Sequence, residues 1–536
     1  MKSDFGFGRR PAARSAPCFA TLLVGVLALA LARAVEGAGA ETPAKGTVLT
    51  TPVVVVSETG ERQTAEQGLF FVPENRSADT SKTIAIHFMR FGAEQAVAAR
   101  APVFLLAGGP GSVYDFTEAK DFEIAKRLRR TRDVVYVGQR GNPREPGLTP
   151  SLYLEIDGAP LDRPTEFNAG VQRLRAALTT AQERWLAAGV DLAGYDIMNI
   201  SSDLYELREA LGYPKIALRG CSFGSQWSMT YMKRFPETVD RALLSGVEPL
   251  DFAYDSPAGL WAGMSRLAEL SERNAQLASS IPEGGLMAAL TTVVERLEQA
   301  PVSVPLPGPD GQELIVVVGV EDLRDALTYS FGDTRWERHE NWPRFILEMH
   351  AGDFRYLAAL ALRARSNVRR TTLIGLLIDN SLGISRRRDA QLLAEAETRW
   401  LGDINAYYRE TRDLTATTPV DESFLSDFRV DYPVLLVNGD IDWSTPLENA
   451  QHALGFLDRG HLVTVRGAGH CPLANELRDH RPEVMEQIYR FFEADFSEDD
   501  GFFDGLPDEV DLPAYDFATL EGPSLYEQAV ARFMSR

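Results

Sequence analysis

The sequence has few metal-binding side chains and little positive charge for its length. Its 536 residues include three cysteines and seven histidines, and none of them form a cluster at metal-ligand spacing, so we expect no metal site. Glycine-rich loops of the kind that cradle phosphates are also lacking, so no cofactor is expected. The 55 Lys and Arg are outnumbered by 76 Asp and Glu, which gives a formal net charge of −21. An acidic surface repels polyphosphate, which argues against nucleic acid as a partner.

Long apolar runs are also lacking, apart from one near the N-terminus. Residues 19–32 form an apolar run of about 14 residues, preceded by basic residues and followed by small-x-small patterns at 32–34 and 38–40. The run is shorter than the roughly 20 residues that span a bilayer. It predicts a signal peptide over 1–40, export to the periplasm or the outside of the cell, and no stable membrane insertion after cleavage. The alternative is a transmembrane anchor.

The rest of the composition is that of a globular protein. Apolar residues make up 45% of the chain and charged residues 24%, which is typical of a full hydrophobic core. The length exceeds that of a usual single domain, so we expect a core domain with a sizeable insertion. Short apolar runs at 102–107, 133–137 and 215–218 alternate with helical patterns at 169–189 and 197–211. This alternation predicts a parallel sheet covered by helices on both faces.

Three further strands are expected late in the chain, at 241–245, 434–437 and 461–465. The interval between the first two is mostly helical, with a Pro/Gly-rich break at 301–311. We interpret it as a cap over the edge where the strands end; an independent domain is the alternative. The predicted organisation is a signal peptide at 1–40, a core at 41–249 and 431–495, a cap at 250–430, and an acidic, solvated tail at 496–536.

A G-x-S-x-G motif at 220–224 gives the clearest chemical signal. It follows the apolar strand at 216–218 and precedes a helical pattern at 226–235. In this context the serine occupies a strained strand-to-helix turn, and small residues two positions on either side avoid clashes with the neighbouring strand and helix. The free N–H groups of the helix N-terminus point at the same place. Ser222 is therefore the predicted nucleophile.

A nucleophilic serine needs a base, and the base needs a carboxylate to orient it. In the α/β-hydrolase fold these residues follow the chain order serine, acid, histidine. His470 lies in a glycine-rich turn just after the strand at 461–465 and is the predicted general base. Asp440 and Asp442 both follow the strand at 434–437. Either can supply the acid on this evidence.

An oxyanion intermediate also needs N–H donors, each worth about 10² to 10³ in rate. The backbone N–H of Phe223 is one expected donor. The other is expected in the Ala-Gly-Gly-Pro-Gly loop at 107–111, where Gly109 lets the backbone approach the substrate with positive φ. These elements predict an α/β-hydrolase fold, in which a mostly parallel sheet is flanked by helices and a large helical cap is inserted between core strands.

Several stretches of the chain share the spacing of one protein family. They are residues 68–73, the G-G-P-G loop, V-V-Y-V-G-Q-R-G at 134–141, the serine turn at 219–225, F-P at 235–236 and S-G-V at 245–247. Together they resemble the prolyl aminopeptidase and tripeptidyl aminopeptidase family of α/β-hydrolases, over nearly all of the mature chain. The acid segment of that family reads G-x-x-D-x-x-T-P. Gly439, Asp442, Thr445 and Pro446 match it, so the resemblance favours Asp442 over Asp440.

The chain departs from this family near the predicted oxyanion loop. Ala107 stands where the family usually has histidine, Gly138 replaces the Asp of its D-Q-R-G segment, and Asn142 and Pro143 stand where it prefers glycine. The loop is therefore expected to be held differently, although the predicted triad is complete.

The resemblance also implies how a substrate is held. In such peptidases, carboxylates associated with the cap bind the free α-amino group of the substrate. Glu248, just past the strand at 241–245, and Asp379, at the end of an apolar segment at 373–378, are the candidates. An ordinary structural salt bridge is the alternative for each.

A second resemblance concerns the cysteines. Cys221 precedes the predicted nucleophile and Cys471 follows the predicted base, which is similar to the CS–D–HC arrangement of tannases and feruloyl esterases. That resemblance implies a disulfide between Cys221 and Cys471, with two buried thiols as the alternative. Such a pair suits an oxidising compartment.

Two enzyme functions follow from these patterns. The first is an exported aminopeptidase of the serine hydrolase type that releases N-terminal residues or short peptides. The second is a carboxylic-ester hydrolase with the same triad, which the cysteine arrangement favours. A non-catalytic binding protein is disfavoured because no triad member is missing. The expected partner is a peptide or small ester substrate, and the sequence leaves the oligomeric state open.

Overall fold

The computed structural model describes residues 43–97, 100–145, 150–308, 312–331, 338–366, 368–496 and 501–534. The predicted signal peptide and Cys18 lie outside this part of the chain. Among the described residues, no helix has the length and apolar character needed to cross a bilayer.

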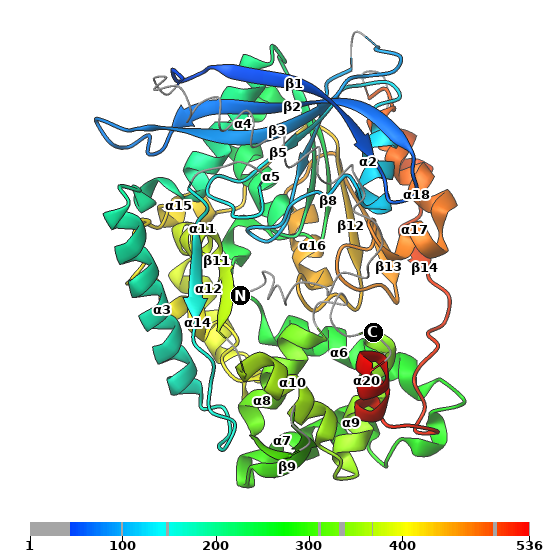
Figure 1. The fold of residues 1–536 in the computed structure, drawn as a ribbon. Coiled ribbons are helices and arrows are strands. Elements are labelled where there is room, and N and C mark those ends of the chain that lie inside the picture. Colours follow the sequence, from blue (N-terminus) through cyan, green and yellow to red (C-terminus); the bar gives the residue numbers. More distant parts are fainter. Residues whose placement is uncertain are drawn as a thin grey trace.

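The described residues form one large sheet of ten strands, in the order β1-β2-β3-β5-β4-β7-β8-β12-β13-β14 (Figure 1). The strands β1, β2 and β3 are antiparallel to their neighbours, and all pairings from β5 to β14 are parallel. The strands are β1 (Val48–Val56), β2 (Arg62–Pro73), β3 (Thr83–Phe91), β4 (Val103–Leu106), β5 (Val134–Val137), β7 (Ile216–Cys221), β8 (Val239–Ser245), β12 (Val434–Gly439), β13 (Gly460–Arg466) and β14 (Glu509–Asp511). The predicted mostly parallel sheet is confirmed.

The central strands are apolar throughout because both faces of the sheet are covered. Phe104 and Leu106 of β4 face one hydrophobic cluster, and Val103 and Leu105 face the other. The first cluster is closed by helices α4 (Ile197–Ala210), α5 (Phe223–Arg234) and α16 (Leu447–Leu454), and the second by α2 (Ala119–Leu128) and α18 (Pro482–Tyr489). Successive side chains of a strand point to opposite faces of the sheet, so one continuous apolar strand contributes to the hydrophobic core on each face.

The chain between β8 and β12 forms a mostly helical cap, as predicted. It contains α6 (Pro257–Glu272), α7 (Gly285–Gln299), α8 (Val320–Asp325), α9 (Trp342–His350), α10 (Arg355–Arg365), α11 (Ile374–Leu382), α12 (Arg386–Ala394), α13 (Thr398–Leu401), α14 (Ala406–Arg409) and α15 (Glu422–Leu425). Part of the cap has its own hydrophobic cluster, which also takes in Ile441 and Trp443 from the loop after β12. The cap therefore packs onto the core at the loop that carries the predicted acid.

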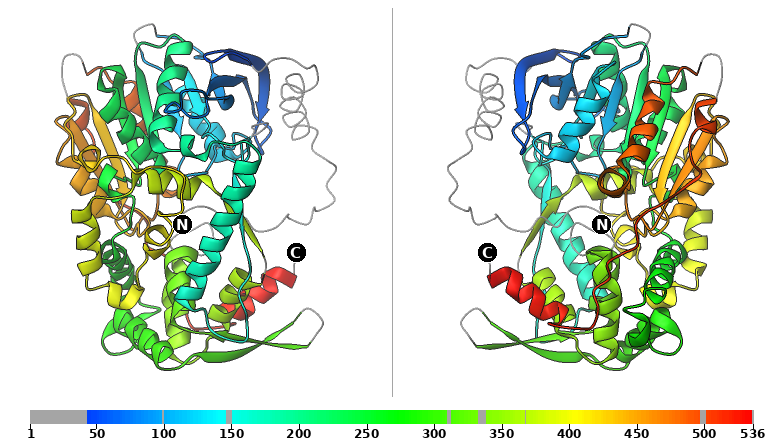
Figure 2. Two further views of the ribbon diagram at one scale, coloured as in Figure 1. Left: turned by 90° about the vertical axis from the view of Figure 1, so that its left-hand side faces the viewer. Right: turned by 90° about the vertical axis from the view of Figure 1, so that its right-hand side faces the viewer.

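The cap extends beyond the predicted range of 250–430. Strand β6 (Tyr153–Ile156) pairs antiparallel with β11 (Arg369–Thr372) inside it, and the long helix α3 (Phe167–Ala187) runs from the core down beside it (Figure 2). The break expected at 301–311 contains strand β9 (Val302–Pro307), which forms a hairpin with β10 (Glu313–Val318). The side chains of β9 alternate between buried and exposed, with Val304 and Leu306 facing inward. This alternation is typical of a strand, and the segment forms one despite its prolines.

Most described residues of the segment at 496–536, which was predicted to be a solvated tail, are exposed or half-buried, but a few buried residues tie it to the sheet and the cap. Val510 is buried in strand β14 at the edge of the main sheet, whereas the acidic residues on either side of it face solvent. The chain then crosses to the cap, where helix α20 (Leu525–Met534) lies near α9 and α10 (Figure 1). Phe517 and Leu525 join the hydrophobic cluster of the cap. Because the segment is acidic overall, these isolated apolar residues were not recognised as buried from the sequence.

Candidate active site

Ser222 lies at the sharp turn between β7 and α5. Its backbone has φ 58° and ψ −132°, a left-handed conformation that is strained for a residue with a side chain. Its N–H donates to the Ser245 carbonyl at 3.0 Å, and its own carbonyl accepts from the Ser225 N–H and hydroxyl, each at 2.7 Å. The side chain is buried, with 6% of its surface exposed. The core thus holds Ser222 in the strained geometry that the motif predicts.

The two glycines of the motif are required by close packing. A β-carbon at Gly220 would lie 2.2 Å from the Gly224 carbonyl oxygen, and one at Gly224 would lie 2.2 Å from the Leu106 carbonyl oxygen. Both distances are far inside van der Waals contact. The turn can therefore form only with small residues at these positions, as the sequence pattern predicts.

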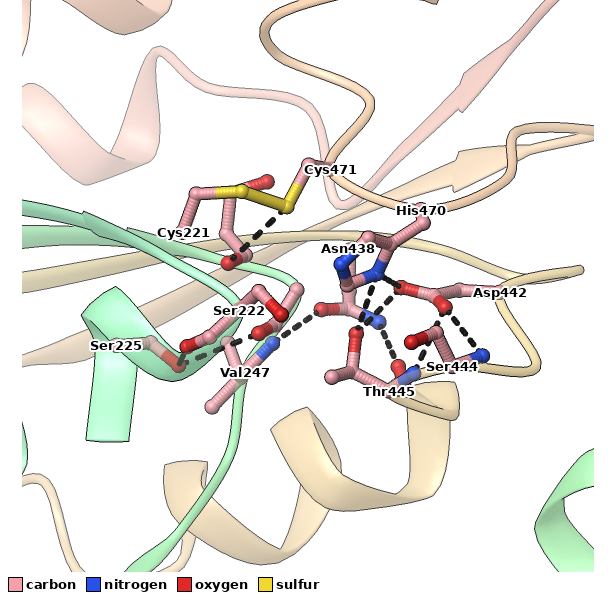
Figure 3. The surroundings of a disulfide bond; sticks show 12 residues. Cys221, Ser222, Ser225, Val247, Asn438, Asp442, Ser444, Thr445, His470 and Cys471 are labelled. Atoms are coloured by element: carbon pink, nitrogen blue, oxygen red, sulfur yellow. Dashed lines mark hydrogen bonds and ion pairs between the residues drawn. A yellow bond between two sulfur atoms is a disulfide. The ribbon is translucent and has the colours of Figure 1, made fainter. Parts of the chain in front are cut away.

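His470 and Asp442 are hydrogen-bonded to each other, as Figure 3 shows. Nδ1 of His470 lies 2.9 Å from Oδ2 of Asp442. Asp442 also accepts hydrogen bonds from the Ser444 N–H at 2.9 Å, the Thr445 N–H at 2.8 Å and the Thr445 hydroxyl at 2.5 Å. The carboxylate is buried, whereas part of the histidine ring is exposed.

The electrostatics keep Asp442 ionised. Burial on its own would raise the pKa of Asp442, but the adjacent His470 ring and the hydrogen bonds from Thr445 outweigh burial and lower the pKa below its ordinary value. An ionised carboxylate can only accept hydrogen bonds, so Nδ1 of His470 carries the proton. The other ring nitrogen, Nε2, is then left to act as a proton acceptor.

Asp440, the alternative acid, has a different position. Its carboxylate accepts the Gly467 N–H at 2.6 Å, and burial raises its pKa. It therefore braces the start of the turn that carries His470, while Asp442 contacts the ring. The structure brings together the acid that the family resemblance favours and the predicted base.

Cys221 and Cys471 form a disulfide, as Figure 3 shows. Their α-carbons are 6.2 Å apart and 250 residues apart in sequence. Cys471 and Ser222 are the two non-glycine residues with positive φ in the part of the chain that the structure describes. The bond thus joins two strained turns, one with the serine and one with the histidine.

The same sulfurs account for a metal-like cluster. Among the described residues, the one group of His, Cys, Asp and Glu side chains close enough to share an ion is Cys221, His470 and Cys471, whose ligand atoms lie within 4.8 Å of one another. Two of these atoms are bonded to each other and are not thiolates, which are the sulfur ligands that metals require. The cluster is therefore a cross-link beside the base and does not form a metal centre.

The loop predicted to hold the oxyanion lies beside Ser222. Gly108 packs against it, because a β-carbon there would come within 3.1 Å of Cβ of Ser222. Gly109 has φ 111°, which is open to glycine and strained for other residues. Phe223 is the first residue of α5, where backbone N–H groups have no partner within the helix. The two predicted donor residues thus lie on separate elements: Phe223 directly follows Ser222, and Gly109 follows the glycine that packs against it.

Gln139 holds this loop, and sequence reasoning did not single it out. The side chain is fully buried and donates to the carbonyls of Ala107 and Gly108, both at 3.1 Å, while its oxygen accepts the Gly111 N–H at 2.7 Å. Gln139 belongs to the Q-R-G segment used for the family resemblance, so the signal was present. Its role became visible only with the fold.

The missing Asp of the D-Q-R-G segment also has a structural account. A β-carbon at Gly138 would lie 2.7 Å from the carboxyl carbon of Glu145. This buried carboxylate contacts Nδ1 of His87 at 2.8 Å and accepts a hydrogen bond from the Tyr136 hydroxyl. The Glu145 carboxylate therefore occupies the space next to Gly138 where the family has the carboxylate of its Asp, and it leaves no room for a side chain at position 138.

Glu248, just past β8, and Asp379, in α11, are both buried. The Glu248 N–H donates to the Ser225 hydroxyl at 2.9 Å, which places this residue one contact away from Ser222. Both carboxylates act on the same tyrosine of α14: burial, and after it the charges of Asp379 and Glu248 among others, raise the pKa of Tyr408 well above its ordinary value. The two candidates thus lie in one acidic neighbourhood.

Comparisons with known proteins agree with this architecture. Residues 101–279 match the family model described as alpha/beta hydrolase fold, and residues 410–478 match the model described as TAP-like protein. A search of curated proteins found no match. The protein has the α/β-hydrolase fold, and the two family matches support a hydrolase.

Solved structures with similar architecture include three hydrolases. A serine hydrolase from Cycloclasticus zankles is 12% identical, with 84% of this chain and 100% of that chain covered and a TM-score of 0.34. Proline iminopeptidase from Mycobacterium smegmatis is 13% identical, with 79% and 99% covered and a TM-score of 0.34. An epoxide hydrolase from hot-environment metagenomes is 14% identical, with 83% and 99% covered and a TM-score of 0.34. At these TM-scores the likeness says nothing about substrate.

Proposed function

We propose that this protein is a serine hydrolase that forms an acyl-enzyme, with Ser222 as nucleophile, His470 as general base and Asp442 as the residue that orients the base. The observation that carries the proposal is the 2.9 Å contact between Asp442 and His470, on a turn cross-linked to the strained turn of Ser222. Together these residues offer the three groups that the mechanism requires: a nucleophile, a base that accepts its proton, and a carboxylate that orients the base.

The residues act in sequence. Nε2 of His470 takes the hydroxyl proton as Oγ of Ser222 attacks the carbonyl carbon, and Asp442 stabilises the imidazolium that forms. Charge on the carbonyl oxygen is stabilised by the N–H groups of Phe223 and Gly109. The imidazolium then protonates the leaving group, which departs and leaves an acyl group on Ser222. Water, activated by the same histidine, releases the acid and restores the serine.

The proposed substrate is a peptide with a free N-terminus. Glu248 and Asp379 are both buried, their charges act on the same tyrosine, and the Glu248 N–H donates to the Ser225 hydroxyl next to the serine turn. A buried carboxylate is stabilised by an ammonium group, so this acidic neighbourhood suits an unblocked α-amino group. The TAP-like match over residues 410–478 agrees with an aminopeptidase.

An ester hydrolase is the second candidate, and the disulfide between Cys221 and Cys471 favours it. The resemblance to tannases and feruloyl esterases lies in this cross-link between the serine and histidine turns. The triad can serve both reactions, because amides and esters each react through a tetrahedral oxyanion intermediate.

One set of substrates separates the two candidates. Aminoacyl and short peptidyl arylamides would be compared with matched aryl esters, each with a free and with a blocked N-terminus. The aminopeptidase proposal predicts turnover of the free arylamides and a loss of kcat/KM on blocking. Turnover of esters alone, with no effect of blocking, would overturn it in favour of the esterase.

We further propose that the mature protein works outside the cytoplasm, as the predicted signal peptide implies. A disulfide persists in an oxidising compartment, and the bond between Cys221 and Cys471 agrees with such a location. Fractionation of cells that produce the full chain, with N-terminal sequencing of the exported form, tests this. An uncleaved protein retained in the cytoplasm would contradict it.

A further inference from the structure

A second carboxylate lies behind the turn that carries His470. Glu476 begins the short helix α17 (Glu476–His480), and its Oε1 accepts the N–H of Gly469 at 3.1 Å. Gly469 is the residue directly before His470. The other oxygen, Oε2, is buried and has no hydrogen-bond partner among the described residues. Glu476 thus holds the backbone of the base with one oxygen and keeps the other out of water.

A residue of the cap also packs against the same glycine. His339, in the cap segment before α9, would lie 2.9 Å from a β-carbon at Gly469, and Oε1 of Glu476 would lie 3.4 Å from it. The His339 ring also packs edge-on against Trp443, which follows Asp442, with centroids 4.9 Å apart. A core carboxylate and a cap ring therefore both crowd Gly469, which leaves no room for a side chain at this position.

Glu476 is also electrostatically coupled to the catalytic pair. Burial raises the pKa of Glu476 most, the hydrogen bonds from its own backbone N–H and from Gly469 lower it, the charge of Asp442 raises it further, and His470 lowers it. The titratable groups that face Glu476 are Asp442 and His470 from the core loops, His339 from the cap, Tyr515 from the C-terminal segment and Arg478 from its own helix. A negative charge here favours the protonated form of His470.

We propose that Glu476 is a positioning residue for His470: it fixes the turn through the Gly469 N–H, and its carboxylate stabilises the imidazolium that forms during attack by Ser222. This inference rests on the proposed function of the triad. It assigns two separable roles to one side chain, because the hydrogen bond needs only an acceptor oxygen, whereas the stabilisation of the imidazolium needs a charge.

Two substitutions separate the roles. Glu476→Gln keeps an acceptor oxygen for Gly469 and removes the charge, while Glu476→Ala removes both. Glu483→Gln, on an exposed glutamate at the start of the next helix α18, is the matched control. We expect E476A to lower kcat by roughly 10- to 100-fold with KM little changed, because displacement of a catalytic group costs about this much. E476Q is expected to recover most of kcat near neutral pH, and E483Q to match the wild type.

The pH profile gives the second readout. Removal of the negative charge lowers the pKa of His470, so the acid limb of kcat/KM, which reports the base in the free enzyme, moves to lower pH in E476Q. An unchanged limb in E476Q, or an unchanged kcat in E476A, would overturn the proposal. Equal losses in E476Q and E476A with the limb unmoved would reduce Glu476 to a structural residue and would overturn it as well.

An NMR titration of the His470 ring makes the result independent of turnover. The ring would be observed in histidine-labelled wild type, E476Q and E483Q, and assigned with His470→Gln. A lower His470 pKa in E476Q alone supports the proposal, and equal values in all three overturn it. If Ser222→Ala kept full activity, the proposed function would fail, and the NMR titration would still decide whether Glu476 acts on His470.

Discussion

The serine turn and the histidine turn are held in different ways. Around Ser222, every restraint described here comes from the core: β8 accepts its N–H, Ser225 bonds to its carbonyl, and the strand end at Leu106 packs on Gly224. The turn before His470 is held by several parts of the chain. Asp440 and Glu476 bind it from the core, His339 packs on it from the cap, and the C-terminal segment bonds to Gly467 through Tyr515.

The two loops are joined by a disulfide, yet they depend on different parts of the protein for their position. The proposed nucleophile is held by the sheet, whereas the position of the proposed base depends on how the cap and the C-terminal segment sit on the core. Replacement of the Ser222 side chain should therefore affect chemistry alone, and substitutions around the histidine turn should link chemistry to the stability of the cap junction.

The largest effect is expected at the nucleophile. Ser222→Ala should reduce kcat by on the order of 10⁶, as loss of a triad serine does, while thermal stability stays at or above that of the wild type because a strained position loses only a hydroxyl. Steady-state kinetics on arylamides and esters, with calorimetry on the same samples, measure both quantities. Persistence of turnover would remove Ser222 from the mechanism.

The next largest effect separates the two aspartates. Asp442→Asn should lower kcat by about 10⁴, because an amide no longer holds the His470 tautomer that accepts the serine proton. Asp440→Asn, the matched control, keeps an acceptor oxygen for the Gly467 N–H and leaves the contact between Asp442 and the ring in place, so it should cost far less. Kinetics of both purified variants decide the matter; equal losses would mean that the acid is misassigned.

Removal of the disulfide tests the link between the turns. The double substitution Cys221→Ser with Cys471→Ser opens a loop of 250 residues, and the entropic model gives at most about 5 kcal/mol of lost stability. We expect lower thermal stability together with a lower kcat, because the base turn loses its tie to the serine turn. Reduction of the wild type with dithiothreitol should reproduce the loss, and a reduced protein of unchanged kcat would show that the core alone aligns the two turns.

Acid should weaken the cap junction through His339. Burial lowers its pKa from 6.5 to about 4, so its neutral form is favoured in the folded state. The folded pKa lies below the unfolded one, so this contribution to stability is present above pH 6.5 and is lost as pH falls toward 4; it amounts to on the order of 3 kcal/mol. Thermal unfolding of His339→Gln and wild type between pH 7 and 4 measures it. Parallel curves for the two proteins would contradict the prediction.

The smallest expected effect is at the C-terminal segment. Tyr515→Phe removes the hydroxyl that donates to the Gly467 carbonyl at 2.7 Å, for a loss of about 1 kcal/mol in unfolding free energy and a modest fall in kcat. Tyr526→Phe, on α20 beneath Arg355, is the control on the same segment. A fall in kcat for Y526F equal to that for Y515F would show that the segment acts as a whole and does not act through this bond.

Sequence reasoning singled out the candidate groups that lie in local motifs. Ser222 has its glycines two residues away, His470 lies in a glycine turn after a strand, and Asp442 fits a short family pattern, so each carries its signal within a few residues. The parallel strands were also predictable, because burial on both faces leaves continuous apolar runs.

The residues that hold these groups had no such signal. Glu476 and His339 meet at Gly469 although they are more than 130 residues apart in sequence, and neither stands in a distinctive pattern. Such contacts follow from the way the cap packs on the core, which no local pattern encodes. Gln139 was the exception, because it lay in a segment already matched to a family. The cysteine pairing was implied by resemblance and not by spacing.

The position of β14 and α20 also bears on how the protein is made. Residues 509–511 complete the edge of the main sheet beside β13, and Arg344 of the cap binds carbonyls of residues 519 to 523 just before α20. A nascent chain that has already delivered Ser222, Asp442 and His470 from the ribosome still lacks Tyr515, the partner of Gly467. The turn that carries the proposed base therefore gains its bond from Tyr515 only after the chain has been synthesised well beyond all three residues of the proposed triad.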